Sequence, residues 1–563
     1  MTSSASESAA RIHQRRGSGV AGAGMMAASF PELCCIETWA YRNRFHSGTQ
    51  VSRYVLPLSR GRRGERFRGP PDASRGAGRG CCAPHMTQRS NTMNVTKRWT
   101  LVVVCAATAM LMLDIAVVNT ALSRIAEDLD TGLSGLQWVV DAYTLALASV
   151  VLTAGALADR LGRKRMFVGG LSLFTVASLG CALAQDIVFL NTMRAIQGIG
   201  AAVMFAVSLA LLAQAFPEMK ERAGALAAYG ATIGGSFAIG PLVGGALTSG
   251  LDWQWIFLIN IPVGIAAIAI TRRYVAESSD PQARRIDWTG QALLTGGLFL
   301  LVLALLRGNE DGWTSALIVG ELVAAGALLF AFVRWELETR EPMLPLGLFK
   351  NSAFTGAQVA AFAISASFFA IFLYITLYLQ QVLGLSAIEA GLVYLPGTVV
   401  MFVVSGATAA LGEKVSPRMM IGVGLTLVGA GMLQMLLTVD VDSSWSAALP
   451  GSIIAMIGTG LFNPAVTAVA LGSVPVEQSG LAAGTNDTFR QAGIALGVAA
   501  LGALVPAEHA FGGNPAEYVD GFKDALLVSA ILCVAGAAAA VALIRGQFAG
   551  EPSGAAVPEP AAA

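Results

Sequence analysis

The apolar residues of this chain are gathered in long blocks. From Trp99 onward, fourteen blocks each hold about 20 residues, the length that an α-helix needs to cross the hydrocarbon core of a bilayer. They cover residues 99–121, 134–157, 166–184, 189–214, 223–247, 254–271, 288–306, 313–334, 353–380, 386–410, 418–438, 447–471, 482–505 and 523–545. Because short polar segments separate these blocks, the pattern predicts an all-α polytopic membrane protein with fourteen transmembrane helices.

The composition supports this interpretation. Charged residues make up 13% of the 563 residues, whereas soluble domains average about 25%. The mean hydropathy is +0.62. These values exclude a water-soluble enzyme as the class of protein, and no phosphate-binding loop or nucleophile motif is found that would indicate an ATP-driven pump or a hydrolase.

Residues 1–92 differ from the rest of the chain. They contain fourteen Arg and five acidic residues, are rich in Gly and Ser, and have no periodic apolar face. We expect a disordered basic extension here and a disordered tail at 546–563. Met93 opens the segment MNVTKRW, a short basic lead into the first apolar block, which favours a translation start at Met93 or, alternatively, at Met86. Four of the seven Cys and three of the four His lie in this extension, so neither a metal site nor a cofactor is expected.

The basic residues of the loops predict the orientation in the membrane. With a cytoplasmic N-terminus, eighteen loop Lys and Arg fall on the cytoplasmic side, and Arg124, Arg307 and Lys523 fall on the other side. Positive residues favour the cytoplasmic side. We therefore expect a multi-pass protein of the cytoplasmic (inner) membrane with both termini in the cytoplasm.

A weak internal repeat predicts the domain organisation. Displacing the chain by 254 residues places Leu157, Asp159, Arg160 and Lys164 on Leu411, Glu413, Lys414 and Arg418, and both stretches are loops between spans. A parallel duplication of this kind places the substrate between two related halves. We expect an N-terminal six-helix bundle at 93–271, a central helix pair with its loops at 272–350, and a C-terminal six-helix bundle at 351–545.

Three charged residues lie within the N-terminal spans. The rise of an α-helix places Asp114, about 15 residues into the first span, at a depth similar to that of Asp141 and Arg194. A carboxylate that approaches or leaves an Arg captures or releases a proton, so these three residues are candidates for proton coupling. The alternative is a permanent ion pair that only holds helices together.

Five motifs occur in an order that resembles the fourteen-helix drug:proton antiporter family of the major facilitator superfamily. They are LDIAVVNTAL (Leu113–Leu122), GALADRLGRKR (Gly155–Arg165), LNTMRAIQGIGAA (Leu190–Ala202), GPLVGG (Gly240–Gly245) and WQWIFLINIPVG (Trp253–Gly264). The resemblance covers about residues 95–545. It implies the major facilitator fold, with two six-helix bundles and two extra central helices. It also implies efflux of drugs or antibiotics and proton coupling at the positions of Asp114 and Arg194.

The resemblance also implies gating residues. Asp159 and the basic residues around Gly162, which include Arg163 and Arg165, would form breakable charge contacts between helices. Gly240 and Gly244 lie four residues apart on one helix face, and Pro241 removes a backbone hydrogen bond, so this helix can approach a neighbour closely and bend. In the family the Gly-Pro motif implies a seal against ion leak, and simple packing is its alternative. For the charged loop the alternative is topogenesis by positive residues.

Aromatic and polar residues in the spans are candidates for the substrate cavity, because aromatic faces with a few polar tips suit flat, apolar or cationic compounds. They are Trp138, Tyr143, Phe369, Tyr374, Tyr378, Asn463 and Arg490. We expect a monomer that exports a small amphipathic molecule in exchange for protons, with the lipid bilayer as its surroundings and no nucleic acid as partner. Alternatives are a dedicated exporter of one metabolite, an uptake system and a membrane sensor without transport activity.

Overall fold

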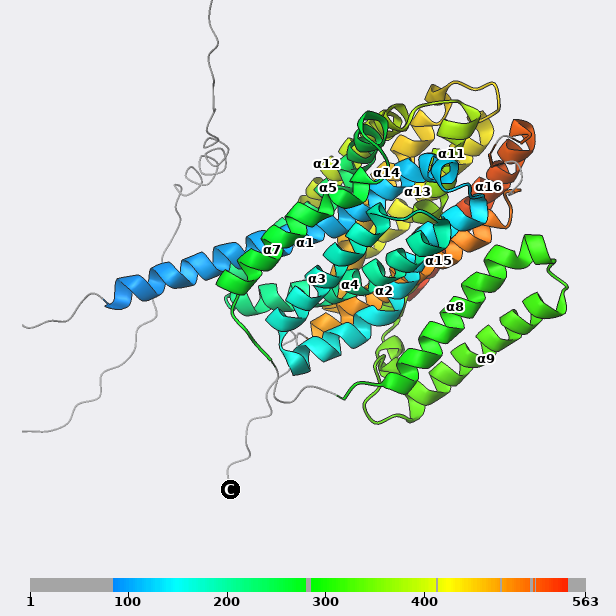
Figure 1. Ribbon diagram of the computed structural model, residues 1–563. Helices are drawn as coiled ribbons and strands as arrows, with labels where there is room; N and C mark the ends of the chain where they lie inside the picture. The colour runs from blue at the N-terminus through cyan, green and yellow to red at the C-terminus, as the bar shows by residue number, and fades with distance from the viewer. Residues whose placement is uncertain are drawn as a thin grey trace, which may run out of the picture. The chain divides into compact units, whose positions relative to one another are not determined.

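A computed structural model describes residues 85–279, 285–411, 414–475, 478–506, 510–511 and 513–544. The expectations for residues 1–84 and for the tail at 546–563 lie outside these ranges. Within them, every long element is an α-helix and no strand occurs. Figure 1 shows the helices lying side by side along one direction.

The first six spans correspond to seven helices. α1 (His85–Asp128) begins before the first apolar block, and the sixth span is divided into a short α6 and a longer α7 around Ile259. The others are α2 (Leu133–Leu161), α3 (Arg163–Ala182), α4 (Ile187–Ala215), α5 (Met219–Gly250), α6 (Trp255–Leu258) and α7 (Asn260–Tyr274).

The remaining spans follow in the expected order. They are α8 (Trp288–Asp311), α9 (Ala316–Glu338), the composite α10–η2–α11–η3 helix (Ser352–Val382), α12 (Ala387–Leu411), α13 (Pro417–Thr438), α14 (Leu449–Gly472), α15 (Ser479–Gly502) and α16 (Pro515–Leu543). Short 3₁₀ turns lie at Leu346–Lys350 and Trp445–Ala447. In the described residues, thirteen helices are long and apolar enough to cross a membrane. The remaining predicted span, the thirteenth in chain order, is α15; it has the length but carries Asp487 and Arg490.

Side-chain caps mark several helix starts. Asp186, Asp287, Ser315 and Ser416 each accept a hydrogen bond from a backbone N–H in the first turn of the helix that follows. These are the residue types that satisfy the free N–H groups of a helix start. The capping residues therefore explain why the chain turns where the apolar blocks end.

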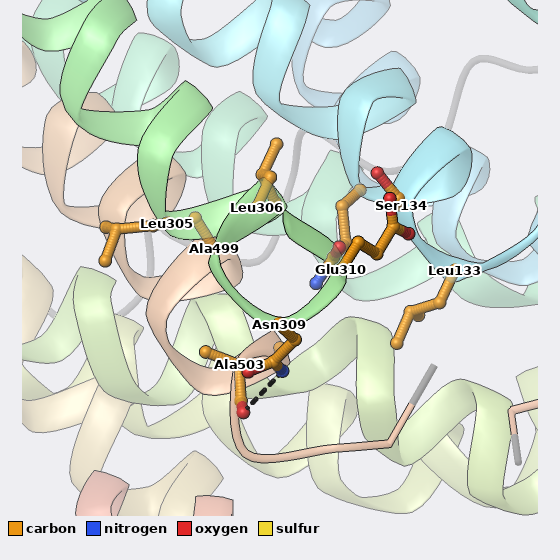
Figure 2. Close-up of a pocket in the computed structure, with 10 residues that line it drawn as sticks. Leu133, Ser134, Leu305, Leu306, Asn309, Glu310, Ala499 and Ala503 are labelled. Carbon is orange, nitrogen blue, oxygen red and sulfur yellow. Dashed lines mark hydrogen bonds between the residues drawn. The ribbon is translucent and has the colours of Figure 1, made fainter. Parts of the chain in front are cut away.

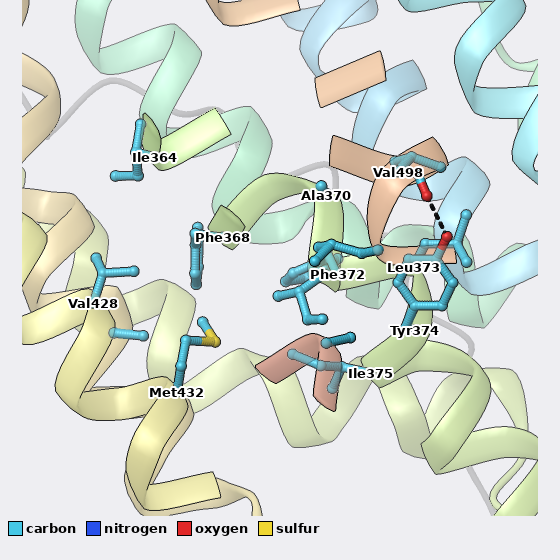
Figure 3. Close-up of a cluster of buried hydrophobic side chains, with 14 of the residues drawn as sticks. Ile364, Phe368, Ala370, Phe372, Leu373, Tyr374, Ile375, Val428, Met432 and Val498 are labelled. Carbon is cyan, nitrogen blue, oxygen red and sulfur yellow. Dashed lines mark hydrogen bonds between the residues drawn. The ribbon is translucent and has the colours of Figure 1, made fainter. Parts of the chain in front are cut away.

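The composite helix is the most buried span. It contains two π-helical turns, Ser365–Phe369 (η2) and Tyr378–Val382 (η3), inside an otherwise α-helical stretch. In its most apolar window 83% of the residues are buried. Figure 3 shows Phe368, Phe372 and Tyr374 from this helix near Val428 of α13 and Val498 of α15. Single π turns interrupt the regular backbone bonding and are frequent at functional sites.

Two helix pairs connect the first six spans to the last six. α5 packs against α12, and α2 packs against α15. α8 contacts both α2 and α15, and α9 packs along α8, so the central pair lies beside the α2–α15 interface (Figure 1). We call the end of the bundle with the turn Leu161–Arg163 the basic end, and the end with the turn Leu129–Gly132 the distal end.

At the distal end the two halves are held together by hydrogen bonds. The amide of Gln137 on α2 donates to the Tyr374 hydroxyl at 2.7 Å, and Gln380 donates to the carbonyl of Thr120 at 3.0 Å. The backbone N–H of Ile388 donates to Ser249 Oγ at 3.1 Å. The halves are therefore closed to one another at the distal end.

Candidate functional site

A buried ion pair lies inside the first six helices. Nη1 of Arg194 on α4 is 2.6 Å from Oδ2 of Asp114 on α1, and the two residues are 2% and 1% exposed. The sequence predicted a similar depth for these two residues, and in the structure they form an ion pair. A buried ion pair is stable only when the remaining hydrogen-bonding atoms of both side chains also have partners.

Three neutral side chains complete the polar cluster. Gln197, one turn from Arg194, donates to Asp114 Oδ1 and to Ser178 Oγ at 2.8 Å each, and its carbonyl accepts from Arg194 Nη1 at 2.6 Å. Asn260 at the start of α7 donates to Asp114 Oδ1 at 3.1 Å. Four helices, α1, α3, α4 and α7, thus contribute to a single network around one carboxylate.

A fifth helix, α2, also contacts the Arg194 side chain. Nε of Arg194 donates to the carbonyl of Val139 at 3.0 Å, and the guanidinium lies 4.3 Å from the centre of the Tyr143 ring. A cation over an aromatic face is attracted by its quadrupole. Tyr143 is fully buried, and its ring covers one face of the Arg194 guanidinium.

Asp141 lies outside this network. It is fully buried on α2, and neither carboxylate oxygen has a hydrogen-bond partner in the described residues. It follows Gln137 by one helical turn and so shares the side of α2 that faces Tyr374 and the second half. An ionised carboxylate without a partner is costly to bury. The neutral, protonated form of Asp141 is the one that fits this environment.

The turn between α2 and α3 contains the predicted gating residues. Arg163 binds Asp159 one turn away at 2.9 Å. Gly162 has φ +107°, a conformation that favours glycine, and a Cβ there would lie 2.7 Å from the Glu277 carboxylate. Glu277 in turn accepts the backbone N–H of Lys164 at 2.9 Å and lies 3.7 Å from Nε of Arg165. In this state these contacts join the turn to the segment that follows α7, in the same half.

The glycines of α5 allow close packing against α1. A Cβ on Gly240 would collide with Cβ of Ala116, and one on Gly244 would collide with Thr120 and Val117. Pro241 is in the interior of α5, and its carbonyl lies against Gly391 of α12. The motif therefore has helix neighbours on two sides, one from each half.

Several predicted substrate residues make structural contacts. Trp138 packs against Phe299 of α8 with ring centroids 5.8 Å apart, and Tyr143 encloses Arg194. The Tyr374 hydroxyl accepts from Gln137 and donates to the Val498 carbonyl. Tyr378 donates to the Asp440 carbonyl at 2.9 Å and stacks on Phe522.

The other three are Phe369, Arg490 and Asn463. Phe369 meets Phe237 of α5 edge-on at 5.4 Å, and the Arg490 guanidinium lies 5.7 Å from the Phe369 ring centre. Asn463 on α14 has a buried side-chain oxygen with no partner in the described residues. The structure thus brings Phe369 and Arg490 together, with Phe237 as a contact from the other half.

A small cavity lies at the distal end between α2, α8 and α15 (Figure 2). Its volume is about 20 Å³, which is enough for one water molecule. Asn309 closes one side by donating to the Ala503 carbonyl at 2.8 Å. The cavity is too small for a drug-sized compound. Among the described residues, no group of three or more His, Cys, Asp or Glu could hold a metal ion.

Sequence reasoning missed Gln197, Asn260, Ser178 and Glu277. Gln197 and Asn260 lie inside motifs that were identified, LNTMRAIQGIGAA and WQWIFLINIPVG. Their position within those motifs was the available signal. Glu277 is 113 residues from Lys164, and nothing in the sequence pointed to that contact.

Comparison with known proteins identifies the family. Residues 104–498 match the model of the Major Facilitator Superfamily. The Multidrug resistance protein Stp of Mycobacterium tuberculosis is 35% identical over 415 residues, which are 74% of this chain and 77% of that protein. The Methylenomycin A resistance protein of Streptomyces coelicolor is 34% identical over 396 residues, covering 70% of this chain and 83% of that protein. The Puromycin resistance protein pur8 of Streptomyces alboniger is 35% identical over 434 residues, covering 75% and 86%.

A solved structure shows the same fold. The crystal structure of the peptide transporter POT in complex with sulfate aligns with a TM-score of 0.58 at 15% identity, and the alignment covers 79% of this chain and 96% of POT. The fold class predicted from the sequence, two six-helix bundles with two extra central helices, is confirmed. The chain is a multi-pass membrane transporter, not an enzyme, and it belongs to the major facilitator superfamily.

Proposed function

We propose that the protein exports amphipathic drugs or antibiotics across the cytoplasmic membrane in exchange for protons. The relatives named for multidrug, methylenomycin A and puromycin resistance support export of such compounds. The absence of an ATP-binding motif in the sequence supports an ion gradient as the energy source.

The Asp114–Arg194 pair carries the proposal. The pair is buried; Arg194 holds Oδ2 of the carboxylate, and the neutral amides of Gln197 and Asn260 donate to Oδ1. Protonation of Asp114 removes the charge that holds Arg194, and Arg194 is also bonded to Val139 on α2. Proton binding to Asp114 in the first half would then shift α2, which packs against α15 of the second half.

Asp141 serves as a second proton site in this proposal. Its carboxyl group has no hydrogen-bond partner among the described residues while the distal end is closed. Separation of α2 from Tyr374 would admit water to this side chain, and the proton would leave. Alternating access follows if the proton returns only when the distal end closes again. In this scheme both termini are cytoplasmic, the protein works as a monomer, and the basic end faces the cytoplasm.

The test uses proteoliposomes that contain the full chain and a fluorescent cationic dye. An imposed pH gradient should drive dye movement, and an uncoupler should stop it. Asp114→Asn should abolish gradient-driven movement while the protein remains folded in the membrane. Full gradient-driven transport by Asp114→Asn would contradict the assigned role.

A second candidate is a dedicated exporter of one antibiotic. The names of the methylenomycin A and puromycin resistance proteins favour it, because each refers to one compound. A panel of chemically unrelated dyes distinguishes the two, since a dedicated exporter moves none or one of them.

A further inference from the structure

The two interfaces between the halves differ along their length. On α5, Gly230, Gly234 and Phe237 lie on the same face as Pro241 and Gly245, because their spacings of 3, 4 and 7 residues return to one side of a helix. On α12, the residues Ile388, Gly391, Phe402 and Gly406 share a face, because their spacings of 3, 11 and 4 residues are close to whole helical turns. The α5–α12 contact can therefore be followed from the distal end to the basic end.

At the distal end these faces touch. A Cβ on Gly245 would lie 2.8 Å from Cα of Ile388, and one on Gly391 would collide with the Pro241 carbonyl. Nearer the middle, the described neighbour of Gly234 from the other half is a long side chain. The Phe402 ring lies 3.6 Å from the Cβ position of Gly234.

Toward the basic end the contact is lost. Gly230 and Gly406 occupy the facing positions one turn beyond Gly234 and Phe402, and both are exposed. No heavy atom of a described residue on another segment lies within 4 Å of the Cβ position at either glycine. The two helices therefore diverge beyond Phe402, within the apolar spans Gly224–Gly250 and Ala387–Thr408.

The α2–α15 interface stays closed at the corresponding level. Gly484 lies five residues from the basic end of α15, as Gly406 does on α12, yet Leu152 of α2 is 3.0 Å from its Cβ position. α8 also covers this interface, with a hydrogen bond between Gln291 and Thr153 and the Phe299–Trp138 contact. One interface is thus sealed and covered, and the other opens within the membrane.

We propose that the α5–α12 interface is a lateral portal, bounded by Gly230, Gly234, Phe402 and Gly406, through which an amphipathic substrate enters from the bilayer. This rests on the proposed function as an exporter of such compounds. The opening lies in apolar spans, so acyl chains surround its mouth. Phe402, 44% exposed, spans the opening to within 3.6 Å of the Cβ position of Gly234.

The inner end of the portal is aromatic. Phe237 follows Gly230 by two turns on the portal face of α5 and meets Phe369 at 5.4 Å. Arg490 lies over Phe369. A flat apolar compound that passes Phe402 would therefore reach a pair of rings, with a charged group directly behind them.

The first experiment does not depend on a transported compound. The full chain is reconstituted with a phosphatidylcholine that carries a diazirine in its acyl chain, irradiated, and analysed by mass spectrometry for adducts on Phe237 and Ile239. Ile239 is 48% exposed and reports contact with bulk lipid, whereas Phe237 faces the second half. We expect adducts on both. Labelling of Ile239 without Phe237 would overturn the portal.

The second experiment blocks the portal with Gly230→Trp or Gly406→Trp. Because rates depend exponentially on barrier height, we expect each substitution to lower Phe237 labelling and the initial rate of Hoechst 33342 transport by about tenfold. Ile239 labelling should not change. Gly320→Trp on α9 is the matched control, since Gly320 is also exposed with open space around its Cβ position in the described structure.

The two proposals can fail separately. If the wild type labels at Phe237 but moves no dye, the proposed export fails and the lipid-accessible opening stands. If the wild type moves dye while the Trp variants do so at the wild-type rate, the portal fails and export stands. If the Trp variants stop transport without lowering Phe237 labelling, they act on the movement of the halves, and the portal is again overturned. Thermal unfolding of each variant checks that it is folded.

Discussion

Nε2 of Gln197 lies 2.8 Å from Oδ1 of Asp114, on the side of the carboxylate that Arg194 does not hold. The same amide reaches Ser178, and the Gln197 carbonyl accepts from Arg194. A neutral side chain therefore contacts both members of the ion pair. It fixes their orientation without adding a charge that would compete for the proton.

Replacement of Gln197 by Met should destabilise the protein. The change keeps the side-chain length but leaves Asp114 Oδ1 and Arg194 each with one partner fewer, which costs about 1–3 kcal/mol for a buried group. Thermal unfolding in detergent measures the loss. Gln434→Met is the control, because Gln434 is half-buried and bonds Thr438 one turn away on the same helix. Equal unfolding temperatures for the two variants would show that Gln197 does not support the pair.

Two glycines of α5 should respond oppositely to Ala. Gly240→Ala places a methyl group against Ala116, and overpacking of this kind costs about 1–3 kcal/mol. Gly230→Ala meets no described neighbour and should be neutral, or stabilising by up to about 1 kcal/mol through helix propensity. Unfolding of the two variants side by side checks the order, and a reversed order would contradict the packing described for α1 and α5.

Gly162→Ala should disturb the turn between α2 and α3. A non-glycine residue at φ +107° is strained by about 1–3 kcal/mol, and the new methyl group also meets the Glu277 carboxylate. We expect a lower unfolding temperature and slower transport. Gly169→Ala in α3, where no described atom of another segment lies within 4 Å of the Cβ position, should lower neither. Wild-type stability of Gly162→Ala would be incompatible with the observed backbone.

Tyr374→Phe should favour opening of the distal end. The substitution removes the hydroxyl that receives Gln137 from the other half, and one hydrogen bond is worth about 0.5–1.5 kcal/mol, or roughly a two- to tenfold change in population. A cysteine at Leu133, which is 1% exposed near this contact, should then react faster with a maleimide. Tyr378→Phe is the control because its hydroxyl bonds Asp440 within one half. Equal reaction rates in the two variants would argue against a role for Tyr374 in closure.

Charged residues in apolar spans were the most informative sequence signal for the site. Asp114 and Arg194 could be selected because an ionised group is rare within a span. Gln197 and Asn260 escaped notice because a single amide in a span is common and its partners depend on how the helices pack. The contact between Asp159 and Arg163 follows from their spacing of four residues, whereas the contact of Glu277 with the same turn depends on tertiary structure.

The aromatic residues show a different limit. When a span is apolar on every side, the periodicity of its residues does not indicate which face is buried. Trp138 and Phe369 looked alike in the sequence, yet one packs on α8 and the other meets α5 across the halves. The fourteen spans were predictable from their length, but the π turns at Ser365–Phe369 and Tyr378–Val382 were not, because no residue type specifies them.

A stretch of seven residues on α2, 137–143, faces both the interior of the first half and the second half. Val139 and Tyr143 touch Arg194 inside the first half, and Gln137 and Asp141 lie on the side toward the second half. A displacement of the Arg194 guanidinium would therefore reach the boundary between the halves without passing through any other helix. Communication between the interior charge and that boundary would take place within two turns of a single helix.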